Sequence, residues 1–359
     1  MGTEATSLLA RLTQSIVAAK ASDAHIRSGQ PLFVRHEGRL AKGPGPPLTA
    51  AQVASILTEA SGRDVERMVA HHWEFSCGAG QFRFRGHAFR ETNGWGFTLR
   101  AIPPEIPAFQ ELRLPPGIRT LAEPGPGLTL VTGPMGSGKS TTAAALMKHA
   151  VSGDPIHLLT LEDPIEFPIL GGNGCVSQRE VGRDVASYSD GLRAALREDP
   201  DYIFLGEIRD LEQLEVALQA AETGRTVLTT FHTSSAVKTV GRLIGMFRAD
   251  EQVAARARLA DSLRGIVCQR LLPRKGARAR VLCTEVMINN YAAKECIRDA
   301  GRVAGLTAVM ERSNDQNMHT LDQSMIAAVR AGVLELEIAV QYAVSPGDVR
   351  RALSLHGTG

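Results

Sequence analysis

The spacing of apolar and polar residues predicts two parts of different character. In residues 7–20 leucine and isoleucine recur at helical spacing, which predicts an amphipathic helix, and a second helix is predicted over residues 50–61. Residues 81–90 and 94–102 alternate residue types with period two around a short ETN segment, which predicts a β-hairpin. The first hundred residues therefore predict a small α+β domain.

From about residue 115 onward, apolar strand segments alternate with helical segments. The strand segments are GLTLVTG, IHLLTLED, YIFLGEIRD and RTVLTTFH. This alternation predicts an α/β fold with a parallel sheet that helices cover on both faces. After about residue 250 the pattern becomes mainly helical. The boundaries predicted from these patterns are 1–105 for the N-terminal domain, 106–114 for a linker, 115–265 for the α/β core and 266–359 for a mainly helical C-terminal region.

The composition is that of an ordinary globular protein. Hydrophobic residues make up 43% and charged residues 22% of the 359 residues, which argues against disorder or a fibrous repeat. A net charge of +2 gives no strong attraction to nucleic acid or to an anionic membrane. No apolar run approaches the ~18 residues of a membrane-spanning helix, and no signal-peptide pattern opens the chain, so a cytoplasmic protein is expected. The five cysteines form no C-x-x-C pair, which argues against a zinc knuckle.

A phosphate-binding loop is predicted at GPMGSGKST, residues 133–141. The segment matches G-x-x-x-x-G-K-[ST], follows a predicted strand and opens a predicted helix. Its glycines let backbone amides turn toward an anion, and the helix adds its positive end. Lys139 is expected to reach the β- and γ-phosphates of ATP, and the Ser140 hydroxyl to hold Mg²⁺. The predicted nucleotide-binding residues are Gly133, Pro134, Gly136, Ser137, Gly138, Lys139, Ser140 and Thr141.

Acidic residues at the ends of the following strands are candidates for the chemistry of hydrolysis. TLEDPIEF supplies Glu162, Asp163 and Glu166, and IFLGEIRD supplies Glu207 and Asp210. Nucleotide hydrolysis needs a positioned water and neutralised charge around the transferred phosphoryl group. An apolar strand that ends in a carboxylate is the Walker B arrangement, in which the acid acts through Mg²⁺ or its water shell. A small-molecule kinase would share only the phosphate loop and would leave these acids unexplained.

Taken together, these motifs resemble the PilT-type branch of the secretion ATPase superfamily. The resemblance is carried by ASDAHIRSG, GPMGSGKST, LTLEDPIEF, the block from SQREVGRD to GEIRDLE, AAETGRTVLTTFHTSS and TLDQS, between about residues 21 and 325. The members are hexameric motors of type IV pili and related export systems. The resemblance implies a PAS-like N-terminal domain joined to a RecA-like ATPase domain, with ATP bound at the subunit boundaries of a homohexamer.

The resemblance also implies roles for single residues. Glu166 matches the proposed general base that activates water, and Glu207 matches the Walker B glutamate, a ligand of Mg²⁺ directly or through water. His232 matches the second histidine of the family's His box, and its strand is expected beside the Walker B strand, where a γ-phosphate sensor would be useful. For histidine in general, a turn residue or a satisfied buried ring is the commoner reading.

Three arginines complete the set of candidates. Arg225 stands where the family has its first His-box histidine, and its permanent charge fits a contact with an acidic neighbour or phosphate but no proton-dependent role. Arg85 and Arg100 match arginines that reach toward nucleotide across a domain or subunit boundary, where they could stabilise transition-state charge. The same positions also fit arginines on the polar face of an exposed strand.

The resemblance does not decide which pilus or secretion machine the chain serves. Without a tetracysteine zinc insert, the sequence favours the retraction-type branch, with an inner-membrane platform protein as partner and a peripheral place at the inner membrane. The retraction motif AIRNLIRE is altered to AAKECIRD at residues 292–299. A type IVB secretion or conjugal transfer ATPase, and an accessory subunit with weak hydrolysis, therefore remain alternatives.

Overall fold

The structure is a computed structural model that describes residues 7–19, 21–36, 39–79, 82–102, 106–277 and 279–354. The chain forms two compact units. The first comprises Met1–Ile106 with Pro164–Pro168, and the second comprises Pro107–Asp163 with Ile169–Gly359. The predicted linker, 106–114, consists of loop and turn residues, whereas most of the proline run before it lies outside the described residues.

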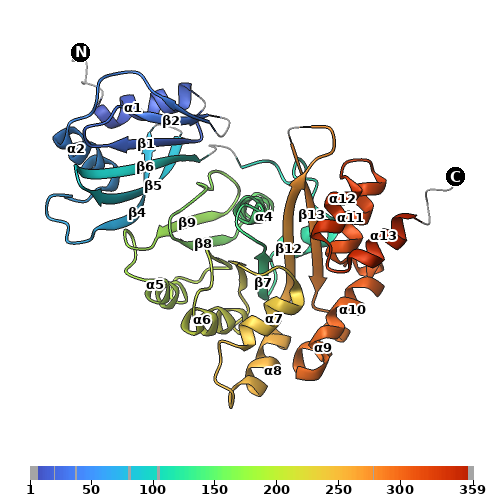
Figure 1. Ribbon diagram of the computed structural model, residues 1–359. Helices are drawn as coiled ribbons and strands as arrows, with labels where there is room; N and C mark the ends of the chain where they lie inside the picture. Colours follow the sequence, from blue (N-terminus) through green and yellow to red (C-terminus); the bar gives the residue numbers. More distant parts are fainter. Residues whose placement is uncertain are drawn as a thin grey trace. The chain divides into compact units, whose positions relative to one another are not determined.

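The first unit is an antiparallel sheet with two helices (Figure 1). Its strands run in the order β3-β2-β1-β6-β5-β4, and both helices pack apolar side chains into its core. The predicted helices and hairpin are present, the hairpin as β5 and β6. The elements are α1 (Leu8–Ala18), β1 (Asp23–Arg27), β2 (Phe33–His36), β3 (Arg39–Lys42), α2 (Ala50–Ser61), β4 (His72–Ala79), β5 (Phe82–Glu91) and β6 (Gly94–Ile102).

Local chemistry fixes the bounds of the second helix in this unit. Helix α2 begins at a capping box, in which Thr49 and Gln52 each accept a hydrogen bond from the other's backbone N–H. It ends at Gly62, whose φ of 67° is left-handed and suits glycine. Between these ends Val53, Ile56 and neighbouring apolar residues are buried, so the helix is fixed by both its caps and its apolar face.

The second unit is built on a seven-stranded sheet in the order β13-β12-β7-β11-β10-β8-β9. Neighbouring strands are parallel except for the β12–β13 pair. The strands are β7 (Gly127–Thr132), β8 (His157–Glu162), β9 (Cys175–Glu180), β10 (Tyr202–Leu205), β11 (Thr226–Phe231), β12 (Leu263–Pro273) and β13 (Arg280–Ile288). This sheet, together with the α+β unit, confirms the predicted fold class.

Helices precede, connect and follow the strands of the second unit. Those up to α8 lie between or beside the parallel strands, and the later ones form the C-terminal region (Figure 1). They are α3 (Pro116–Ala122), α4 (Lys139–Gly153), α5 (Tyr188–Ala195), α6 (Leu211–Glu222), α7 (Ala236–Ile244), α8 (Gln252–Ser262), α9 (Tyr291–Arg298), η1 (Ala300–Gly305), α10 (Leu306–Arg312), η2 (Asn314–Gln316), α11 (Leu321–Arg330), α12 (Leu336–Tyr342) and α13 (Pro346–Ser354). Within the described part of the chain, every helix is too short or too polar to cross a lipid bilayer.

The β12–β13 hairpin departs from the sequence interpretation, which placed mainly helical structure after about residue 250. Residues 263–288 instead add two long strands to the sheet. The centre of β12, residues 265–269, is buried on both faces, so its short apolar run, residues 265–268, shows no period-two alternation. Such a run does not distinguish a buried strand from a buried helix.

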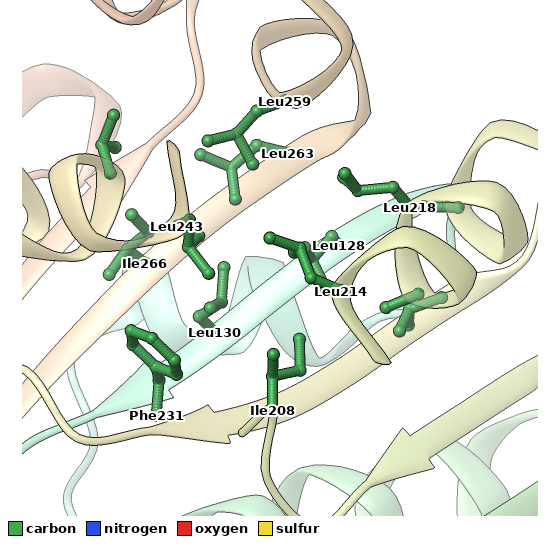
Figure 2. Packing of buried hydrophobic residues seen from close by; sticks show 14 of the residues in the cluster. Leu128, Leu130, Ile208, Leu214, Leu218, Phe231, Leu243, Leu259, Leu263 and Ile266 are labelled. Carbon is green, nitrogen blue, oxygen red and sulfur yellow. The ribbon is translucent and has the colours of Figure 1, made fainter. Parts of the chain in front are cut away.

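One face of the parallel sheet packs against α6, α7 and α8 (Figure 2). Leu128 and Leu130 of β7 contact this layer, into which Leu214 of α6 and Leu243 of α7 project. Each of these leucines is 0% exposed. Burying a leucine side chain contributes about 1.5–3 kcal/mol, so this layer is a main source of stability for the strands that carry the site.

Tyr202 of β10 offers a test of burial in the second unit. Its side chain is fully buried, and its hydroxyl has no hydrogen-bond partner among the described residues. An unpaired buried hydroxyl costs about 1–3 kcal/mol, so we expect Tyr202→Phe to raise the free energy of unfolding by about 1 kcal/mol in chemical denaturation. The control Tyr202→Ala leaves a cavity and should lose about 3–5 kcal/mol. Destabilisation by Tyr202→Phe would show that the hydroxyl is bonded.

Candidate functional site

The carboxyl ends of three parallel strands lie at one edge of the sheet. Thr132 of β7 pairs in register with Phe231 of β11, so the next residues, Gly133 and His232, leave the sheet side by side. Strand β10 is the other neighbour of β11, and Glu207 follows two residues after its end. The expectation that His232 emerges beside the Walker B strand, at the edge that holds the phosphate loop, is confirmed.

The phosphate loop adopts a backbone that requires its glycines. Gly133, Gly136 and Gly138 have φ values of 148°, 74° and 89°, which side-chain-bearing residues rarely adopt. A Cβ atom on Gly133 would also lie 2.5 Å from the Ser137 hydroxyl oxygen and 2.5 Å from the Gln269 carbonyl oxygen. The loop is therefore specified by steric exclusion as well as by backbone freedom.

The start of helix α4 fits an anion. No side chain of the described residues caps it, so the first-turn amides, including those of Ser140 and Thr141, point out of the helix end without an intrahelical acceptor. Lys139 is buried, and its ammonium group donates to the carbonyl oxygens of Gly133 and Pro134, each at 3.0 Å. The buried Ser137 hydroxyl has no partner among the described residues. These donors suit the oxygens of a phosphate group.

Glu207 lies in a network of charged side chains at the same edge. One carboxylate oxygen is 3.0 Å from Nε2 of His232, and the other accepts a hydrogen bond from Nε of Arg209. Arg209 also donates from Nη1 to Asp163 at 3.3 Å. The four side chains thus join the ends of β8, β10 and β11, and both oxygens of Glu207 are engaged.

These neighbours keep Glu207 ionised. Burial by itself would raise the pKa of Glu207, but hydrogen bonds and positive charge from Arg209 and His232 outweigh burial and lower that pKa below its ordinary value. For Tyr188, burial and the nearby acids raise the pKa, so the phenol stays protonated. A Cβ atom on Gly206 would lie 3.1 Å from the Tyr188 hydroxyl, which explains a glycine directly before Glu207.

Two other acids from the sequence motifs have structural partners. Asp210 caps helix α6 by accepting a hydrogen bond from the Gln213 N–H at 2.9 Å. Glu162 accepts hydrogen bonds from the Thr160 hydroxyl at 2.8 Å and from the Gln178 amide at 3.2 Å. Asp210 therefore contributes to the fold of α6, and Glu162 braces the β8–β9 edge of the sheet.

Glu166 and the two hairpin arginines lie in the first unit. Oε1 of Glu166 is 3.6 Å from Nη1 of Arg85, and Nη2 of Arg85 also donates to Glu74 at 2.6 Å. Arg85 is directly opposite Arg100 on the β5–β6 hairpin, and Arg100 donates from Nε to Asp23 at 2.8 Å. The hairpin thus places both predicted arginines side by side, while the catalytic roles of Glu166, Arg85 and Arg100 stay predictions.

Arg225 lies at the opposite end of β11 from His232. The strand between them has six residues, which span about 20 Å. Arg225 donates to the Thr223 hydroxyl at 2.8 Å and to the Leu196 carbonyl oxygen at 3.4 Å, and it forms no ion pair with another described residue. The contact with an acidic neighbour that the sequence suggested is therefore not formed within these units, and Arg225 instead ties β11 to the end of α5.

Arg209 is the residue that sequence reasoning missed at this edge. It sits two positions after Glu207, in GEIRD, and it contacts the acid of its own loop and that of the β8 loop. The available signal was an arginine between two acids just after an apolar strand. Its partner Asp163 is 46 residues away, which local pattern cannot reveal.

Comparisons with known proteins identify the family to which the chain is similar. A family model described as type II/IV secretion system protein matches residues 111–340. The type IV pilus retractation ATPase PilT of Pseudomonas aeruginosa is 38% identical over 330 residues, covering 91% of this chain and 95% of that protein. A twitching motility protein of Neisseria gonorrhoeae is 35% identical over 336 residues, covering 93% and 89%.

A solved structure agrees with these relatives. The crystal structure of the pilus retraction motor PilT with bound ADP superposes with a TM-score of 0.86 at 36% identity, covering 96% of this chain and 99% of that one. The fold likeness thus extends over both units and not over the phosphate loop alone. The chain belongs to the type II/IV secretion system protein family, within the PilT-type branch that its motifs resemble.

Proposed function

We propose that the chain is a hexameric motor ATPase that couples ATP hydrolysis to mechanical work on a type IV pilus machine, with pilus retraction and twitching motility as its role. One observation carries the proposal, the convergence of the phosphate loop, Glu207 and His232 at one edge of a parallel sheet. The names of the matched relatives support retraction as the form of work.

The phosphate loop would hold ATP and its magnesium ion. The amides of the loop and of the first turn of α4 would bind phosphate oxygens, with Lys139 turning its ammonium group from the loop carbonyls to the β- and γ-phosphates. Ser140 would hold the ion directly and Glu207 through water. When bound, Mg²⁺ supplies positive charge at the phosphates.

The Glu207 network would detect the γ-phosphate. His232 is 48% exposed and is bonded to Glu207 through one ring nitrogen, which leaves the other available to a ligand. Arg209 holds the second carboxylate oxygen, so Glu207 keeps its orientation and its negative charge. A displacement at the γ-phosphate would therefore be transmitted to the ends of β8, β10 and β11 together.

The first unit would supply the remaining chemistry. We assign Glu166 as the general base that takes a proton from the attacking water, and Arg85 and Arg100 as arginines that neutralise charge on the transferred phosphoryl group. The side chains of Arg85 and Glu166 are 37% and 36% exposed, so their ion pair is weak and can exchange for other partners at little cost.

The assembly and location follow from the same proposal. We assign the chain to a homohexamer in the cytoplasm that associates with the inner membrane through a platform protein of the pilus machine, and no nucleic-acid partner is expected at a net charge of +2.

The altered segment at residues 292–299 is the reason to keep a second candidate function. All of this segment except Asp299 lies in α9, whose Ala293, Cys296 and Ile297 are buried, so the departure from the retraction motif is accommodated without loss of the helix. A type IVB secretion or conjugal transfer ATPase, or a weakly active accessory subunit, would tolerate such a change at a surface that the retraction role would use.

Lys139→Ala tests the nucleotide site. We expect ATP affinity to fall at least 100-fold, because the side chain brings a buried positive charge next to the phosphate loop. The measurement is calorimetric titration with Mg·ATP. Lys148→Ala, an exposed lysine of the same helix, is the matched control and should bind normally. Tight binding by Lys139→Ala would remove the phosphate-loop assignment.

Glu166→Gln tests the general base. We expect kcat for ATP hydrolysis to fall at least ~100-fold while ATP affinity stays within about twofold, since the amide cannot accept the proton from water. Glu74→Gln is the control, because Glu74 is the other acid bonded to Arg85. Equal losses in both variants would assign the effect to Arg85 rather than to a base.

Deletion of the gene in its own bacterium tests the machine. If the chain retracts pili, the mutant should lose twitching and accumulate surface pili, and the wild-type gene but not the Lys139→Ala gene should restore movement. Normal twitching with loss of conjugal or protein transfer would support the second candidate instead. Purified wild-type protein without turnover above the Lys139→Ala background would leave only the accessory role.

A further inference from the structure

A buried polar cluster lies inside the second unit, between the nucleotide edge and the C-terminal helices. At its centre, Cys268 of β12 and Glu285 of β13 are directly paired across the hairpin and hydrogen-bonded to each other. The Thr132 hydroxyl donates to the Cys268 sulfur at 2.9 Å, and Thr239 of α7 also bonds to this sulfur. Thr132 immediately precedes Gly133, the first glycine of the phosphate loop.

The burial of this cluster is costly. Glu285 is 4% exposed and Cys268 is 2% exposed, and burial raises the pKa of both groups. A carboxyl group in such a place is retained only if its oxygens are well bonded, and replacing it by apolar side chains would otherwise be favourable. The contacts of Glu285 therefore indicate what the group is for.

Glu285 accepts hydrogen bonds from the starts of two helices. The N–H of Ala236, the first residue of α7, donates to it at 2.6 Å, and the N–H of Leu321, the first residue of α11, donates to it as well. Helix starts present free N–H groups and partial positive charge, which a carboxyl oxygen satisfies. Helix α11 lies beside β13 (Figure 1), and α7 also contacts this strand. Glu285 thus joins the beginnings of both helices.

Helix α7 in turn holds the loop that carries His232. Arg242 of α7 donates to the His232 carbonyl oxygen at 3.1 Å, and its guanidinium lies 5.1 Å from the centre of the Phe231 ring. The Thr233 hydroxyl is 2.6 Å from the Thr239 hydroxyl of α7. A displacement of His232 would therefore move α7 as a rigid helix.

We propose that Glu285 is a positioning residue that couples the nucleotide edge to helix α11 and so to the C-terminal region. The inference rests on the proposed ATPase function and names the route by which the phosphate state leaves the site. His232 and its loop move α7, and Glu285, bonded to the starts of both helices, moves the start of α11 with it. Thr132 and Cys268 join the phosphate loop to the same point.

The amide Glu285→Gln is the variant of choice, because it keeps the shape but replaces one acceptor oxygen by a donor group. Only one acceptor oxygen then remains for the two helix starts. Cys283→Ala is the matched control: Cys283 is also fully buried on β13 and lies two residues away, and it belongs to the buried apolar cluster that includes Leu321 and Met325 of α11. Circular dichroism and thermal melting establish that each variant is folded.

Two readouts separate coupling from a purely structural role. In steady-state hydrolysis, Glu285→Gln should lower kcat by about 10- to 100-fold with the KM for ATP within about twofold, whereas Cys283→Ala should change neither by more than about twofold. In hydrogen exchange by mass spectrometry, a non-hydrolysable ATP analogue with Mg²⁺ should slow exchange at residues 321–325 of the wild-type protein, and this response should be absent in Glu285→Gln.

Each outcome bears on the proposal. If the analogue leaves residues 321–325 of the wild-type protein unchanged, or if Glu285→Gln keeps the response and kcat, the coupling is wrong. The first of these results does not depend on the folding of a variant, because it is measured on the wild-type protein alone. Wild-type protein without turnover above the Lys139→Ala background would instead overturn the ATPase function, independently of the exchange data.

Discussion

The parallel pairing of β7, β11 and β10 is the constraint on which the site depends. Parallel strands present their carboxyl ends at the same edge, and the register pairs Thr132 with Phe231. The phosphate loop and His232 therefore begin at neighbouring points, and Glu207 follows on the next strand. A slip by one residue would turn the strand faces over and separate these groups, so the apolar layer of Figure 2, which fixes the register, also fixes the chemistry.

The electrostatics of this edge follow from that geometry. An acid next to a phosphate site would be repelled by its ligand, but Glu207 is held between Arg209 and His232, which lower its pKa and share its charge. Asp163 completes the network through Arg209. The edge thus combines an uncapped helix start that attracts anions with one ionised acid in a fixed orientation. This combination suits a metal-bound nucleotide better than a free anion.

Much of this arrangement could be predicted from local sequence. The phosphate loop, the helix over 50–61 and the hairpin each depend on residues within about twenty positions, where spacing and turn residues are informative. The same holds for His232, because a strand end is visible in the apolar run before it.

What the sequence did not reveal depends on distant partners or on burial. The centre of β12 is buried on both faces, which removes the alternation that identifies strands. Arg209 was missed because Asp163 meets it only after the sheet has formed, and Asp210 was counted among the candidate acids although it caps α6. Glu285 bonds to helix starts 49 residues before it and 36 residues after it, so no local pattern marks it.

The central claim is that Glu207 and His232 work as one unit at the nucleotide edge. The most direct test is a double-mutant cycle on kcat for ATP hydrolysis with Glu207→Gln, His232→Asn and the double variant. If the two side chains act together, the double variant should be about as slow as the slower single variant, since either change already breaks the bonded pair. Losses that multiply in the double variant would mean that the two groups act independently, and would contradict the account.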